Sequence, residues 1–147
     1  MIKSSRFILL FMLVIAVLIS ACNQTGSDQS GQTSSSSLER PTPPSNYVNK
    51  KSPRMNEAAI EAGKQAYQIN CSSCHGEKGM GDGPVSASLN PKPEPLAVNA
   101  DQLSDGYLFW RISEGGAGQS FTSAMPAWKS ILKEEQIWQV IAYLRGL

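Results

Sequence analysis

Histidine is almost absent from this chain, because His75 is the only imidazole in 147 residues. Charge is also sparse: Asp, Glu, Lys and Arg make up 17% of the residues and nearly cancel, to a net charge of +1 at pH 7. Such a balance argues against a nucleic-acid partner, which would require a basic surface. The 3 cysteines are an odd number and too few for the disulfide framework of a small secreted domain. Each cysteine therefore needs its own explanation.

The N-terminal residues have the pattern of an export signal. Lys3 and Arg6 precede an unbroken apolar run, Phe7 to Ile19. This run is short for a membrane span, and its length suits the hydrophobic core of a signal peptide. Small residues then lead directly into Cys22, which resembles the lipobox of bacterial lipoproteins. We predict a signal peptide at 1–21 and a lipidated Cys22. The alternative is an uncleaved signal anchor with an incidental cysteine.

This resemblance implies a bacterial lipoprotein that is exported and anchored to a membrane by its acyl chains. The folded part would then face the periplasm or the extracytoplasmic surface. Residues 22–54 are rich in Ser, Pro, Gly, Gln and Thr and have few apolar side chains. Such a segment cannot bury a core, so we predict a disordered tether that ends near Met55. Residues 55–147 remain for one folded domain.

Two stretches of that domain have the spacing of amphipathic helices. From residue 56 or 57 to 70, small and apolar residues recur with helical period, and Gly63 and Tyr67 lie one turn apart. A second apolar stripe runs from about Lys133 to Leu147, with Tyr143 beside it. Because small residues let helices approach closely, we predict that the first and last helices cross.

A third, shorter helix is predicted at 105–114. Ser104 is a good N-cap, and Gly115 and Gly116 would end the helix. Trp110 and Arg111 on this helix could contact a prosthetic group or simply pack on the core. Most of the remaining sequence is rich in glycine and proline, with no convincing strand pattern. The fold class is therefore all-α, with long loops around a small core that a bound cofactor would complete.

The next feature is the run Cys71-Ser72-Ser73-Cys74-His75, which is the five-residue pattern of covalent haem attachment. Thiols at this spacing can form thioethers to the two vinyl groups of one porphyrin, and the histidine is then placed to bind the iron. A thioredoxin-like redox site is an alternative, but it needs a βαβ context that this sequence lacks. A zinc site is another, but no second ligand cluster follows.

Taken together, these motifs resemble those of class I monohaem cytochromes c. The match covers about 55–147, and its elements occur in the expected order. They are Gly63 and Tyr67, the motif Cys71 to Gly76, the loop Gly79 to Pro84, Met125-Pro126-Ala127-Trp128 and the closing run Ile137 to Leu144. The resemblance implies a small cytochrome c fold and one covalent haem c. It also implies that the carbonyl of Pro84 accepts a hydrogen bond from His75. One departure is Lys133, where relatives often have a Ser or Thr cap, so Ser130 could cap the last helix instead.

The second axial ligand cannot be a histidine, because the chain has no other. Besides lysine or water, the candidates in the mature chain are Met55, Met80 and Met125. Met80 is too close to His75 in sequence to reach the other face of the ring easily, and Met55 lies at the end of the tether. Met125 matches the axial methionine of the family, so we predict that it binds the iron. Trp128, next to it, is expected to pack on the haem.

His/Met ligation would fill both axial positions and favour ferrous iron, so it suits electron transfer and leaves no place for a substrate. We therefore expect a non-enzymatic single-electron carrier that shuttles between respiratory or periplasmic redox proteins, with no small-molecule substrate. One alternative is a haem enzyme or gas sensor with an open iron site. Another is a fixed haem subunit of a dehydrogenase or reductase complex.

Overall fold

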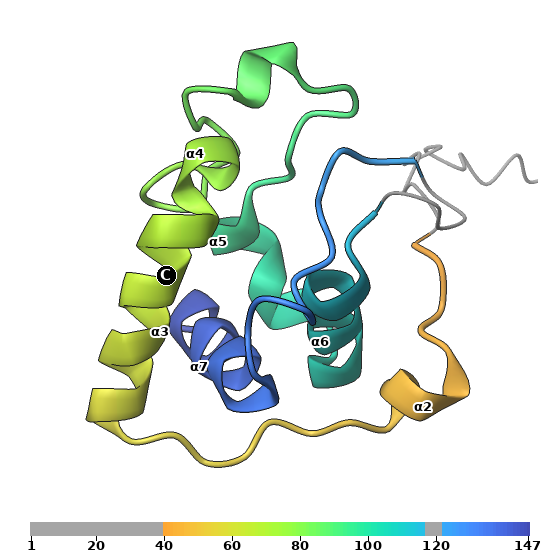
Figure 1. The fold of residues 1–147 in the computed structure, drawn as a ribbon, viewed down its shortest axis with the longest axis vertical. Coiled ribbons are helices and arrows are strands. Elements are labelled where there is room, and N and C mark those ends of the chain that lie inside the picture. Colours follow the sequence, from red (N-terminus) through yellow and green to blue (C-terminus); the bar gives the residue numbers. More distant parts are fainter. Residues whose placement is uncertain (1–39, 117–121) are drawn as a thin grey trace, which may run out of the picture. The chain divides into compact units, whose positions relative to one another are not determined.

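A computed structural model describes residues 40–116 and 122–147 (Figure 1). All of them belong to one of the two units into which the chain divides, Arg40–Leu147. The predicted signal peptide, Cys22 and the first part of the predicted tether lie outside the described residues. Helices are the only regular elements of the described part, which confirms the all-α prediction. In chain order they are α2 (Ser45–Val48), α3 (Glu57–Asn70), α4 (Ser72–His75), η1 (Ser86–Ser88), α5 (Leu96–Asn99), η2 (Ala100–Gln102), α6 (Asp105–Glu114) and α7 (Glu134–Leu144).

Local capping explains where the longer helices begin. The side chain of Asn56 accepts a hydrogen bond from the backbone N–H of Ala59 at 2.9 Å, and Ser104 caps α6 by accepting from Tyr107 N at 3.1 Å. The prediction that Ser130 could cap α7 is wrong. Lys133 is the N-cap, and its backbone N–H donates to the Gln136 side chain at 2.9 Å. Gln136, at the third position of the helix, thus satisfies the backbone N–H of the N-cap residue, which is one half of a capping box.

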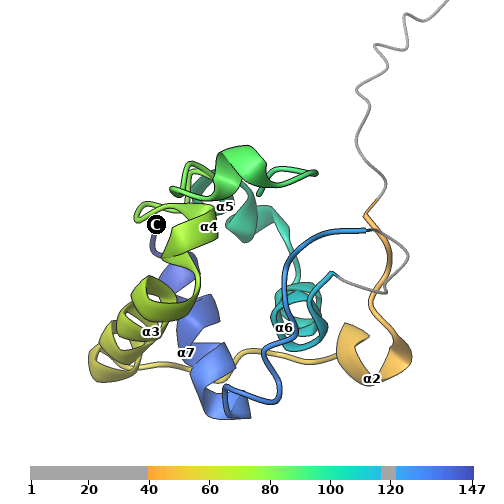
Figure 2. The same cartoon turned by 45° about the horizontal axis from the view of Figure 1, so that its top comes forward.

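The predicted crossing of the first and last helices is confirmed, since α3 lies directly against α7 in both ribbon views (Figure 1 and Figure 2). Gly63 is the point of closest approach, because a Cβ atom there would lie 1.9 Å from the carbonyl oxygen of Gln139. One turn later, the Tyr67 side chain is fully buried, and its ring centroid lies 5.3 Å from that of Tyr143. We call this pair of helices the helix crossing.

The core extends from the helix crossing to α6. The rings of Phe109 on α6 and Trp138 on α7 have centroids 4.4 Å apart, so the two helices share an aromatic contact. Trp110 is buried as well, with its ring centroid 5.9 Å from that of Tyr107 on the same helix. The buried hydrophobic side chains are Tyr67, Ala100, Leu108, Phe109, Trp110, Ile112, Leu132, Ile137, Trp138, Val140, Ile141 and Leu144.

Order begins earlier than the sequence predicted. The tether was expected to reach residue 54, but residues 40–54 form a strap that contains α2, lies against α6 and is linked to α7 by the ion pair of Lys50 with Glu134. The Tyr47 ring lies 6.2 Å from that of Phe109, and Lys50 Nζ lies 4.5 Å above the same Phe109 ring. The strap has no apolar stripe of its own, so its composition predicted disorder. It is held instead by a few side chains whose partners are distant in the sequence.

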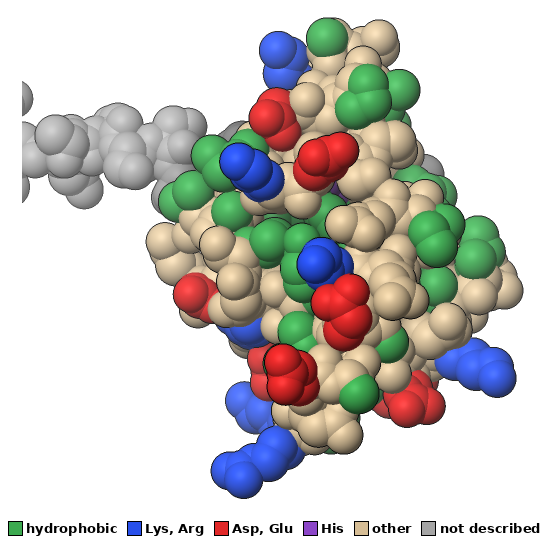
Figure 3. Space-filling model, turned by 90° about the vertical axis from the view of Figure 1, so that its left-hand side faces the viewer, with side chains coloured by type: hydrophobic (Ala, Val, Ile, Leu, Met, Phe, Trp, Pro, Cys, Tyr) green, Lys and Arg blue, Asp and Glu red, His purple; other side chains and the backbone are tan. Residues whose placement is uncertain are grey.

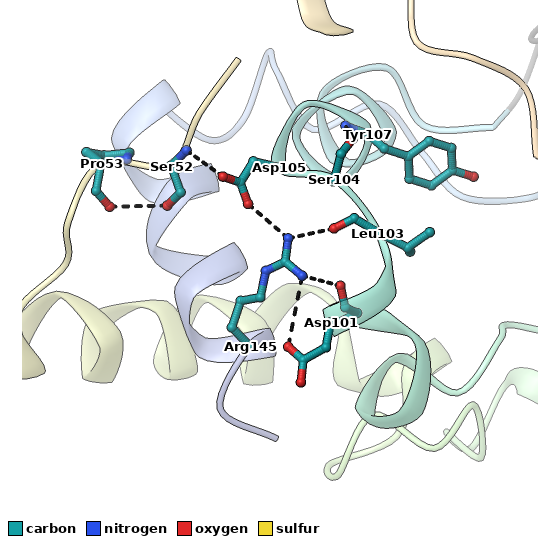
Figure 4. A network of polar contacts seen from close by, with 9 residues as sticks. Ser52, Pro53, Asp101, Leu103, Ser104, Asp105, Tyr107 and Arg145 are labelled. Atoms are coloured by element: carbon teal, nitrogen blue, oxygen red, sulfur yellow. Dashed lines mark hydrogen bonds and ion pairs between the residues drawn. The ribbon is translucent and has the colours of Figure 1, made fainter. Parts of the chain in front are cut away.

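The end of α7 is tied to the start of α6 by Arg145 (Figure 4). Its guanidinium donates to the backbone oxygens of Ala100 and Leu103, and it contacts an Asp105 carboxylate oxygen at 2.9 Å. The other oxygen of Asp105 accepts from the backbone N–H of Ser52 in the strap at 3.0 Å. Asp105 therefore connects three segments that are far apart in the sequence.

Not one of the helices at 40–116 and 122–147 has both the length and the apolar character needed to cross a bilayer.

Candidate haem site

The two cysteines of the motif lie at the junction of α3 and α4. Cys71 caps the C-terminus of α3, and its carbonyl accepts from Cys74 N at 3.1 Å and from His75 N at 2.9 Å. The motif is thus one tight helical turn that continues from the helix crossing. Both thiols are free and half-buried. The turn presents two thiols and an imidazole within five residues, as the motif requires for one porphyrin.

The environment of the thiols does not suit a nucleophilic or redox-active cysteine. Burial, and secondarily the neighbouring Cys74, raise the pKa of Cys71 to about 12. A reactive cysteine needs a lowered pKa, because the thiolate is the nucleophile. Within the described ranges, no group of three or more His, Cys, Asp or Glu residues could hold a metal ion. The thioredoxin-like and zinc alternatives therefore gain no support.

His75 is held in the form that can bind a metal. Burial, assisted by the positive charge of Arg111, lowers the pKa of His75, so that the imidazole is neutral at neutral pH. Its Nδ1 atom is buried without a hydrogen-bond partner, which is costly for a polar atom. A neutral imidazole with an unsatisfied nitrogen, next to two free thiols, fits a covalently attached haem.

The expected hydrogen bond from His75 to the carbonyl of Pro84 is not formed in this structure, since Nδ1 has no partner. The loop around Pro84 does lie against the motif. Val85 N donates to Ser73 O at 3.1 Å, and a Cβ atom on Gly83 would lie 2.4 Å from the same oxygen. These contacts fix the backbone on both sides of Pro84 beside α4, and they leave the ring nitrogen unsatisfied.

The backbone around His75 is anchored from the helix crossing. The buried hydroxyl of Tyr67 donates to the carbonyl of Gly76 at 2.7 Å, and Gly81 N donates to the carbonyl of His75 at 2.8 Å. Gly76 has a φ of 81°, a conformation that favours glycine and lets the chain leave α4 sharply. Tyr67 therefore joins the most buried part of the fold to the predicted iron ligand.

Met125 lies in the segment that follows α6, residues 122–129, which we call the Met125 segment. Met125 and Trp128 are both half-buried and pack against the core, whereas Ala124, Pro126 and Ala127 are exposed. In both ribbon views this segment runs beside α6, while α4 lies at the end of α3 (Figure 1 and Figure 2). The two segments that carry the predicted ligands therefore belong to different parts of the domain.

Sequence reasoning missed the residues that hold the Met125 segment. Glu114 at the end of α6 accepts a hydrogen bond from the hydroxyl of Tyr47 and forms an ion pair with Lys129 at 2.7 Å. Arg111, which the sequence left open, donates to the carbonyl of Gly115 at 2.9 Å. Lys129 and Glu114 could have been suspected from their opposite charges, but no local signal connects Tyr47 with Glu114.

The helical fold and the turn that presents two free thiols beside the half-buried His75 define a class I c-type cytochrome domain, which carries covalently bound haem c. The chain belongs to the family described as cytochrome C oxidase, cbb3-type, subunit III, which it matches over residues 58–144. Electron transfer by a c-type haem is the function that this membership supports.

Curated relatives agree with the family. The chain is 33% identical over 93 residues to the Cbb3-type cytochrome c oxidase subunit CcoP of Azospirillum brasilense, which covers 61% of this chain and 29% of the relative. It is also 33% identical over 99 residues to the subunit FixP of Rhizobium etli, which covers 65% of this chain and 32% of the relative. The chain thus spans only about a third of the length of these relatives.

A solved structure shows the same fold. A chain of the reducing HAO-like protein complex of Kuenenia stuttgartiensis superposes with a TM-score of 0.53 at 22% identity. The match covers 65% of this chain and 46% of that chain. At this level of identity the likeness concerns the fold alone.

Proposed function

We propose that this protein is an exported, membrane-tethered electron carrier, with haem c attached to Cys71 and Cys74 and ligated by His75 and Met125. The observation that carries the proposal is the buried, unpaired Nδ1 of His75 on the turn that bears Cys71 and Cys74, in a chain with no second histidine. Met125 is then the best remaining candidate for the second iron ligand. Trp128, half-buried next to it, would pack on the haem.

When bound, haem c supplies an iron that alternates between Fe(III) and Fe(II) by one electron. The residues of this chain decide what else can happen there. The thioether of Met125 is a weak donor that favours the ferrous state and raises the reduction potential. If His75 and Met125 both held the iron, a substrate would find no free ligand position, so the protein would transfer electrons without making bonds to its partners.

The surface on the face that carries α3 is a candidate docking site for partner proteins. The face that carries α3 has charged side chains of both signs, with hydrophobic side chains gathered between and above them (Figure 3). Three exposed hydrophobic residues flank the motif in sequence, namely Ile69, Met80 and Val85. A mixed surface of this kind suits brief contacts with a redox donor and acceptor better than permanent burial.

An optical spectrum of the haem-loaded protein tests the ligand set. Wild type should be low-spin in both oxidation states and show the weak far-red band of ferric iron bound to methionine. Met125→Ala should lose this band, while Met80→Ala, the matched control, should keep it. A high-spin ferric spectrum, or rapid CO binding by the ferrous wild type, would instead support the open-site haem enzyme or gas sensor.

The membrane tether rests on the resemblance of the leader and Cys22 to a lipoprotein signal. Because one acyl chain gives only marginal binding, the anchor would need the several chains of a bacterial lipoprotein. Cys22→Ser should release the protein from the membrane fraction, and Ser27→Ala in the same segment should not. Continued membrane association of Cys22→Ser would rule lipid anchoring out.

A second candidate is a fixed haem subunit of a larger redox complex. The names of the relatives favour it, because CcoP and FixP are described as oxidase subunits. Purification from the native membrane in mild detergent distinguishes the two. A free shuttle should elute alone, whereas a fixed subunit should elute with stoichiometric partners whose loss abolishes its membrane retention even with Cys22 intact.

A further inference from the structure

The backbone of the Met125 segment is joined to the end of α6. Gly116 N donates to Met125 O at 2.9 Å, Trp128 N to Ile112 O at 3.1 Å and Lys129 N to Ser113 O at 3.2 Å. The two backbones also pack closely between these hydrogen bonds. At a φ of 67°, Gly115 approaches so closely that a Cβ atom on it would lie 2.5 Å from Met125 O. A displacement of the last turn of α6 would therefore displace Met125.

The last residue of α6 is held by two side chains from outside the helix. One carboxylate oxygen of Glu114 accepts from the Tyr47 hydroxyl, and the other lies 2.7 Å from Lys129 Nζ. Only 20% of the Glu114 side chain is exposed, so its hydrogen bond with Tyr47 is partly shielded from water, whereas its ion pair with Lys129 lies at the surface. Hydrogen bonds to a charged group in such a place are stronger than those between neutral groups. Glu114 thus connects the strap, α6 and the Met125 segment.

Tyr47 can act as a fixed point because the strap is itself well anchored. The carbonyl of Tyr47 lies where Gly106 of α6 has no side chain, and a Cβ atom there would lie 2.3 Å from it. Lys50 contacts Glu134 on α7 at 2.9 Å, and Ser52 N donates to Asp105. These contacts join Tyr47 and the strap residues that follow it to the body of the domain.

We propose that Tyr47 and Glu114 are positioning residues for the axial methionine. Together with Lys129 they form a clamp that keeps the end of α6, and through it Met125, in place for the iron. This inference rests on the proposed function, since it presumes that Met125 is the ligand. Loss of the clamp should leave the fold intact and increase the rate at which Met125 leaves the iron.

Tyr47→Phe is the sharpest variant, because it keeps the ring on Phe109 and removes only the hydroxyl. The measured quantity is the rate at which added imidazole displaces the methionine from the ferric holoprotein, followed by the loss of the far-red band. We expect an increase of about tenfold, the order expected when one charge-assisted hydrogen bond is lost. The control is Tyr107→Phe, which removes the hydroxyl of a tyrosine on α6 that is not part of the Glu114 contacts. Its rate of displacement by imidazole should stay within about twofold of wild type.

Glu114→Gln gives an independent test, since it keeps the size of the side chain and removes the ion pair with Lys129. The rate at which imidazole displaces the methionine should also rise in this variant. In the double variant with Tyr47→Phe, the increase should be smaller than the product of the two single increases, because the two contacts form one unit. A merely structural role would lower the free energy of unfolding and leave the imidazole rate unchanged. Either variant suffices if the other fails to fold.

The outcomes separate the two proposals. If Met125→Ala retains the far-red band, the ligand assignment is wrong and the clamp has nothing to position. If the band depends on Met125, but Tyr47→Phe and Glu114→Gln exchange ligands no faster than Tyr107→Phe, the clamp alone is overturned. Faster exchange in both variants, with an unchanged Tyr107→Phe, supports it.

Discussion

The helix crossing and the Met125 segment are held in opposite ways. At the crossing, α3 and α7 meet through close-packed side chains, and Tyr67, Ile137, Val140 and Ile141 are almost completely buried. The Met125 segment has an exposed outer surface and is held mainly by backbone hydrogen bonds to α6 and by the Glu114 contacts. Burial gives the first region stability, whereas directed polar contacts give the second region a defined position with less stability.

This difference assigns separate roles to the two regions. The crossing carries the thiols and His75 on a continuous, rigid turn, and would therefore fix where the haem sits. The Met125 segment would decide whether the second ligand stays on the iron. Substitutions at the crossing should lower the free energy of unfolding, and substitutions in the clamp should change ligand exchange. Substitutions at Gly63, Tyr67 and Asp105, in decreasing order of expected effect, test this separation.

The largest effect is expected at Gly63. In Gly63→Ala the new Cβ would lie 1.9 Å from the carbonyl oxygen of Gln139, a backbone atom that cannot rotate away. We expect the free energy of unfolding in denaturant to fall by about 2–3 kcal/mol, despite the better helix propensity of alanine. The molecules that remain folded should keep the far-red band.

Gly146→Ala is the matched control, because its nearest neighbour, Tyr143 O, would be at an ordinary 3.5 Å. Its stability should change by less than about 0.5 kcal/mol. Equal stability of Gly63→Ala and wild type would show that the helices can separate freely, and the crossing would not be the rigid half of the molecule.

A smaller effect is expected at Tyr67, which connects the helix crossing to the backbone next to His75. Tyr67→Phe keeps the buried ring and removes the hydrogen bond to Gly76 O, next to His75. We expect a loss of about 1–1.5 kcal/mol in the free energy of unfolding, because a buried carbonyl loses its partner. The imidazole exchange rate should not change. A faster exchange would mean that the His75 side and the Met125 side are coupled.

The smallest effect concerns pH. Burial alone would raise the pKa of Asp105, but hydrogen bonds from Ser52 N and the Arg145 guanidinium hold this pKa below its ordinary value. A carboxylate with a lowered pKa stabilises the folded state above the unfolded-state pKa of about 3.9, and the stabilisation is lost as the pH falls through the folded-state value. Wild type should therefore exceed Asp105→Asn in stability at neutral pH, and the difference should shrink below about pH 4.

Denaturant titrations of both proteins from neutral to acid pH measure this difference. Asp101→Asn is the control, because Asp101 lies 3.9 Å from Arg145 and its side chain is 79% exposed. It should show almost no pH-dependent difference from wild type. A difference for Asp105→Asn that is the same at all pH values would exclude the ionised carboxylate as its cause.

The sequence was sufficient for the helix crossing and insufficient for the strap. The bounds of α3 and α6 follow from local signals, namely an Asn and a Ser cap, a regular stripe and a glycine stop. The strap was predicted to be disordered, because its contacts join residues as distant as Tyr47 and Glu114, which no local pattern connects. The hydrogen bond expected at Pro84 also depends on the exact placing of a loop, which spacing does not determine.

The central claim is that Met125, and neither Met55 nor Met80, binds the iron opposite His75. Nuclear magnetic resonance of the ferrous holoprotein with isotope-labelled methionine methyl groups tests it most directly, because a methyl held over the haem is shifted strongly upfield by the ring current. We predict one such methyl, which disappears in Met125→Leu and persists in Met55→Leu and Met80→Leu. The absence of any shifted methyl, or its loss in Met55→Leu or Met80→Leu, would contradict the account.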